Sequence, residues 1–91
     1  MIPNSVIDIE NEAFYKNKLI DIIIPDSVIN IGPSAFKDNK LINLMIPESV
    51  ITIGKDTFSY NPLQTVIIPY RFINELDEIF SDIENISFTF I

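Results

Sequence analysis

The sequence predicts a short repeat solenoid, mainly β in content, in which coils of 22 residues stack to form a parallel sheet. The first observation behind this prediction is a set of prolines spaced 22 residues apart: Pro3, Pro25, Pro47 and Pro69. The second is that serine, valine, isoleucine, phenylalanine, asparagine and leucine recur at the same offset without an insertion or deletion. Many columns that agree on one period are the signature of a repeat architecture. The third is a 47% hydrophobic composition over 91 residues, which suits a single small domain with its own core.

The predicted strands follow the pattern L-x-x-L-x-L and are rich in β-branched residues. They lie near residues 20–24, 42–46 and 64–68, and the proline after each one ends the strand because it cannot donate to a ladder. We expect one domain over residues 1–91. Its parts are repeats at about 3–24, 25–46 and 47–68, and a capping unit at 69–91.

The last unit keeps the spacing but changes its pattern. Its apolar residues between 71 and 83 follow the period of an amphipathic helix: Phe72, Leu76, Ile79, Phe80 and Ile83. We therefore expect a helix near residues 71–82 that covers the core as a C-terminal cap, which adds some α to the mainly β content. A last strand near 86–90 is expected to pair with 64–68. At the other end, Ile2, Val6, Ile9 and Phe14 are expected to close the core with no helix over them.

Composition excludes several classes of function. The chain has no cysteine and no histidine, so it lacks thiolate chemistry and the commonest general base. A net charge of −7 argues against a nucleic-acid or anionic membrane partner. No apolar run reaches the ~18–20 residues of a membrane span, and the acidic N-terminal residues do not form a signal peptide. We expect no enzyme activity, no cofactor and no metal. Asp26 and Glu48 share a column, but two carboxylates fall short of the oxygen ligands that Ca²⁺ requires.

The repeat resembles the BspA-like (Treponema pallidum-type) leucine-rich repeats. The second copy carries the matching residues Ile24-Pro25, Ser27-Val28, Ile31-Gly32, Ala35-Phe36, Asn39, Leu41, Leu44 and Ile46. The third copy repeats them, with Thr57 in place of the family's alanine, and the first copy has Glu10 in place of the glycine. The resemblance covers about residues 2–69. It implies a right-handed superhelix used for protein–protein contact, often at microbial cell surfaces or in secreted proteins.

Several columns are expected to be structural. The phenylalanines are expected to stack as a spine through the core, the asparagines to satisfy turn backbone, and the serine hydroxyls to close local turns. These columns are Phe14, Phe36 and Phe58; Asn17, Asn39 and Asn61; Ser5, Ser27 and Ser49.

The candidate binding residues are the strand positions that point away from the core, on the concave face of the predicted sheet. They are Ile20, Asp21, Ile23, Ile42, Asn43, Met45, Gln64, Thr65 and Ile67. A contiguous exposed apolar patch of more than a few hundred Å² is uncommon on a monomeric protein unless the patch has a binding function. An isoleucine-biased composition without any partner would place the same residues there. A narrower ladder of Ile7, Ile29 and Ile51 fits either the core or the surface.

These features predict a non-catalytic module that binds a protein partner through its concave sheet. Weak self-association as a homo-oligomer is also predicted, either end to end through the first coil or face to face through the apolar patch. The alternative is a structural role, as the C-terminal end of a longer adhesin-like array or as a self-associating small protein.

Overall fold

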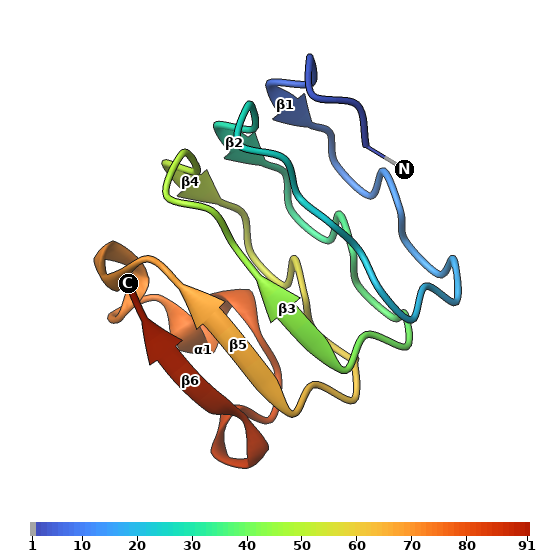
Figure 1. Ribbon diagram of the computed structural model, residues 1–91. Helices are drawn as coiled ribbons and strands as arrows, with labels where there is room; N and C mark the ends of the chain where they lie inside the picture. The colour runs from blue at the N-terminus through green and yellow to red at the C-terminus, as the bar shows by residue number, and fades with distance from the viewer. Residues whose placement is uncertain (1) are drawn as a thin grey trace.

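The computed structural model describes residues 2–91 and contains two parallel sheets of three strands each (Figure 1). One sheet has the order β1-β2-β4 and the other β3-β5-β6, and Figure 1 shows them as two separate rows of arrows. The strands are β1 Asp8–Ile9, β2 Asn30–Ile31, β4 Thr52–Ile53, β3 Asn43–Met45, β5 Thr65–Ile68 and β6 Ser87–Phe90.

The 22-residue period of the sequence is also the register of both sheets. Ile9 pairs with Ile31 in the first sheet, and Leu44 pairs with Val66 in the second. Because equivalent residues lie side by side, each column of the sequence becomes a row of like side chains. The buried core consists of such rows, from Val28 beside Val50 to Leu41 beside Leu63.

Strands β3, β5 and β6 confirm three predicted strands to within about a residue at each end. The strand predicted near residues 20–24 is wrong, because that segment pairs with no other strand. It lies next to β3, where the Lys40 N–H donates to Leu19 O (2.7 Å).

The sheet β1-β2-β4 was not predicted. Its strands are two residues long, too short for an alternating pattern to stand out in the sequence. The local signal is one exposed polar residue followed by one buried isoleucine, as in Asn30 and Ile31.

The single helix predicted over residues 71–82 is also wrong. The segment forms three short pieces, η1 Tyr70–Phe72, α1 Leu76–Ile79 and η2 Ile83–Asn85. The cause is hydrogen bonding to the preceding repeat, because the N–H groups of Asp56 and Phe58 donate to the carbonyls of Glu78 (2.6 Å) and Ile79 (3.0 Å). A continuous helix ending at residue 82 would use the Glu78 carbonyl itself.

The apolar residues of that segment are nevertheless on the inside, as their periodicity predicted. Phe72, Ile79 and Phe80 are buried, and Leu76 and Ile83 pack against the core. The spacing of these residues thus predicted which side chains face inward, although it did not predict the backbone conformation.

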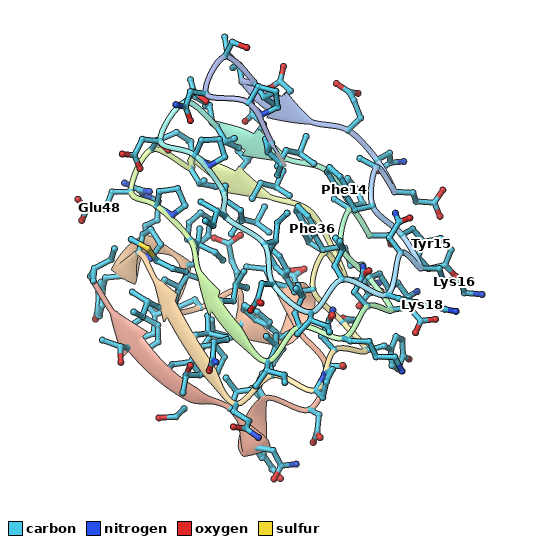
Figure 2. The ribbon with its side chains drawn as sticks, turned by 45° about the vertical axis from the view of Figure 1, so that its right-hand side comes forward. Phe14, Tyr15, Lys16, Lys18, Phe36 and Glu48 are labelled. Atoms are coloured by element: carbon cyan, nitrogen blue, oxygen red, sulfur yellow. The ribbon has the colours of Figure 1, made fainter. Side chains whose placement is uncertain are left out.

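The phenylalanine spine is confirmed. Phe14, Phe36 and Phe58 stack nearly parallel at centroid distances of 5.0 and 5.3 Å, and Phe80 continues the stack at 5.7 Å. Phe36 is fully buried with a ring on either side, whereas Phe14 is half-buried at the end of the row (Figure 2).

The asparagine column is structural, as predicted. Asn39 is 3% exposed, and its Oδ1 accepts from the N–H groups of Asn17 (3.0 Å) and Leu19 (2.9 Å). Its Nδ2 donates to the carbonyls of Phe14 and Phe36, both at 2.9 Å. One side chain therefore ties the turn of its own repeat to the turn of the preceding one.

The expectation that serine hydroxyls close the turns is wrong. The Oγ atoms of Ser27 and Ser49 are buried and have no hydrogen-bond partner among residues 2–91. The turns are closed by the backbone instead, since Val28 N–H donates to Pro25 O (3.1 Å) and Val50 N–H to Pro47 O (3.2 Å).

The two glycines allow adjacent repeats to approach closely. A Cβ on Gly32 would lie 2.7 Å from Asn11 N and 2.9 Å from the Glu10 carbonyl carbon, and a Cβ on Gly54 would overlap the Pro33 backbone. Glu10 occupies the equivalent position of the first repeat and is exposed. A glycine is therefore needed in this column only in those repeats that have a preceding repeat packed against them.

Phe36→Ala is expected to lower the free energy of unfolding by about 3–5 kcal/mol, because it removes a fully buried ring from a close-packed core. Phe14→Ala is expected to cost less, since Phe14 has one stacked neighbour and is half-buried. Urea unfolding of both variants measures the difference. A larger loss for Phe14→Ala would contradict this order of packing.

Gly54→Ala is expected to destabilise the protein by about 1–3 kcal/mol, the usual cost of overpacking, because its Cβ meets backbone that has no room to move aside. Glu10→Ala is the matched comparison, because it places the same side chain in the same column at an exposed site. Thermal unfolding of the two variants should show a lowered midpoint for Gly54→Ala alone. Equal midpoints would show that close approach does not require the glycine.

Candidate protein-binding surface

Five large apolar side chains lie exposed on one side of β3 and β5 and of the segment that precedes them in the row. We call this the isoleucine face, and it consists of Ile20, Ile23, Ile42, Met45 and Ile67. Their exposed fractions run from 77% for Ile23 to 36% for Ile42.

The face arises from the alternation of side chains along a strand. In β3 the pattern is Asn43 out, Leu44 in and Met45 out, and β5 repeats it with Thr65, Val66 and Ile67. The sheet register then sets Met45 beside Ile67. The sequence pattern predicted each of these directions.

A polar row runs through the same face. Asn43 lies beside Thr65, whose Oγ1 donates to Asn43 Oδ1 (2.6 Å). Asp21 and Gln64 are exposed as well. All nine predicted binding residues are therefore exposed, and the register brings those of β3 and β5 together.

The two ends of the isoleucine face carry opposite charge. Lys18 and Lys40 precede the outward-facing residues of the first two repeats, whereas Asp26 and Glu48 follow them, and all four side chains are exposed. Figure 2 shows Lys18 at one side of the molecule and Glu48 at the opposite side.

The acidic end of the face is hollowed. A depression of about 420 Å³ is lined by Asp26, Met45, Pro47, Glu48, Ser49 and Ile91. It combines two carboxylates with three apolar side chains, so its chemistry suits a cation on an aliphatic stem.

The ladder of Ile7, Ile29 and Ile51 lies on the surface, with exposed fractions of 54%, 41% and 54%. This finding settles the question that the sequence left open. Beside it, Asn30 Nδ2 donates to Asp8 Oδ1 (2.7 Å), and Thr52 Oγ1 donates to Asn30 Oδ1 (2.5 Å). This polar row was not among the predicted features, although its three members share one column of the repeat.

Among residues 2–91, the N-terminal end of the core is only partly covered. Ile2 and Ile9 are buried and Val6 and Phe14 half-buried, and together they line a mainly apolar depression of about 240 Å³. The residues expected to close this end do so, with an apolar recess left between them.

Residues 2–91 contain no cluster of three or more acidic, histidine or cysteine side chains arranged to hold a metal ion. No helix within that range is long and apolar enough to cross a membrane.

A family model described as a BspA type leucine rich repeat region (6 copies) matches residues 1–91. Comparison with curated proteins and with solved structures gave no match.

Proposed function

The chain belongs to the BspA-type leucine-rich repeat family, and we propose that it is a non-catalytic module that binds a protein partner through the isoleucine face. In this proposal residues 1–91 form one domain. Its 22-residue coils wind into a right-handed superhelix that the unit at 69–91 closes. The family suggests a protein-interaction repeat and is typical of cell surfaces and secreted proteins, so we propose the same setting for this chain.

The observation that carries the proposal is the exposure of five large apolar side chains on one face. Fully burying such a side chain contributes ~1.5–3 kcal/mol. Side chains that are about half exposed can therefore supply ~4–8 kcal/mol together, which is comparable to the cost of association. A partner that adds polar or ionic contacts at the rim would make the net free energy of binding favourable.

A non-catalytic role is supported by the residues available. The chain has no histidine or cysteine to act as base or nucleophile, and proteins of this family are generally not enzymes. The exposed acids Asp26 and Glu48 lie in an open depression rather than in a cleft that excludes water.

A second candidate is the assembly role, in which another repeat stacks on the N-terminal end. The apolar recess beside Phe14 favours it. Glu10 opposes it, because a repeat packed as closely as the others would meet a side chain where Gly32 and Gly54 have none. We therefore prefer the interaction module.

Ile23→Lys combined with Met45→Lys is expected to reduce capture of the partner at least tenfold, because two charges must be desolvated in an apolar contact. The measurement compares immobilised wild-type and variant protein as baits for proteins of the source organism. Both side chains are exposed, so the free energy of unfolding should stay the same.

The matched control is Ile7→Lys combined with Ile51→Lys, which makes the same chemical change at similarly exposed sites on the other ladder. This control should capture the partner as well as the wild type does. Equal loss in both double variants, or no loss in either, would refute binding through the isoleucine face.

A further inference from the structure

We propose that the isoleucine face binds a second copy of this chain. The two copies pack face to face about a two-fold axis that runs along the direction in which the repeats stack. This inference rests on the proposed function, because it uses the same face and names the partner.

The charges at the two ends of the face are self-complementary. Lys18 and Lys40 stand one repeat apart at the start of the outward-facing residues, and Asp26 and Glu48 stand one repeat apart at their end. The backbone bond from Lys40 N to Leu19 O (2.7 Å) keeps the two lysines in adjacent turns. Each lysine is followed eight residues later by its acid.

A two-fold axis along the stacking direction reverses the strands and keeps each repeat opposite its own equivalent. The lysine end of one copy then lies over the acidic end of the other. Lys18 faces Asp26 of the second copy, and Lys40 faces Glu48 of the second copy. An axis along the strands would set lysine against lysine and acid against acid. The charges therefore select one of the two arrangements.

The same symmetry brings the apolar rows together. The axis passes over Ile22 and Leu44, midway between each lysine and its acid. At ~3.3 Å per residue, Ile23 of one copy then lies within about one residue spacing of Ile20 of the other. Met45 and Ile42 are related in the same way. The row of Ile20 and Ile42 in one copy therefore packs against the row of Ile23 and Met45 in the other.

The depression at the acidic end fits a lysine of the second copy. Asp26 and Glu48 supply carboxylates for the ammonium group, and Met45 and Ile91 line the same hollow and can contact its aliphatic stem. In this orientation the hollow lies opposite the lysine end of the second copy. An axis along the strands would instead set it opposite the acidic end of the second copy. Geometry and charge thus agree on the occupant.

Asp21 is the one charged residue within the face, and it opposes the contact. It occupies the column of Asn43 and Thr65 and lies opposite the Ile23 row of the second copy. Its desolvation makes the dimer weak and concentration-dependent. Asp21→Asn should accordingly tighten it several-fold.

Sedimentation velocity of the full chain between micromolar and millimolar concentrations tests the proposal. The wild type should pass from monomer to dimer over this range. Lys40→Glu alone and Glu48→Lys alone should each weaken the dimer at least tenfold, because each creates two like-charge contacts. An equimolar mixture of the two variants should dimerise at least as well as the wild type, since both contacts are again attractive.

The control variants are Lys55→Glu and Glu10→Lys, which make the same changes in net charge away from the face. Neither should alter the dimer by more than about twofold. A wild type that stays monomeric at millimolar concentration overturns the proposal. A mixture of Lys40→Glu and Glu48→Lys that stays as weak as either variant alone overturns it as well.

The same variants separate this proposal from the proposed function. If the protein is monomeric but its capture of another protein still depends on Ile23 and Met45, the second-copy proposal fails and the proposed function stands. If Ile23→Lys combined with Met45→Lys changes neither dimerisation nor capture, both fail.

Discussion

The rest of the structure depends on stacking identical side chains at the 22-residue register. Phe14, Phe36, Phe58 and Phe80 lie 5.0, 5.3 and 5.7 Å apart, and a row of rings at this spacing forms when each repeat returns to the same place. Asn39 stabilises this register through both ends of its amide. Its oxygen accepts from the turn of the preceding repeat, and its nitrogen donates to that turn and to its own. Apolar burial and backbone satisfaction therefore impose the same register.

The same constraint explains where the repeats change. Gly32 and Gly54 sit where backbone of the preceding repeat leaves no room for a Cβ, while Glu10 sits in the equivalent place with its side chain exposed. At the other end, the carbonyls of Glu78 and Ile79 continue the inter-repeat hydrogen bonds, and α1 is four residues long. Each departure from the repeat pattern therefore lies where the backbone contacts an adjacent repeat, or where no such repeat precedes it among residues 2–91.

The repeat pattern predicted which side chains are buried and which are exposed. It did not predict the features that depend on local backbone geometry. Burial of Phe36, Leu44 and Val66 was predictable from the repeat, because these columns occupy the inward-facing positions of its pattern. The missing strand at residues 20–24, the broken helix at 71–82 and the unpaired hydroxyls of Ser27 and Ser49 depend on individual hydrogen bonds. The exposure of the nine candidate residues was predictable from the x positions of the L-x-x-L-x-L pattern. The depression beside Glu48 was not, because Ile91 joins it from a distant part of the chain.

A repeat that stacks in register turns every exposed column into a row, and this has a consequence for recognition. One lysine before the outward-facing residues and one acid after them become, in two adjacent repeats, two parallel rows of opposite charge. Such a surface is complementary to its own rotated copy without any residue having been placed for a particular partner. Net charge of −7 opposes association at long range, but the Debye length of ~8 Å at physiological salt limits that repulsion to near contact. In the dimer that we propose, the arrangement of Lys40 over Glu48 decides the orientation at contact, and the apolar rows between them supply the driving force.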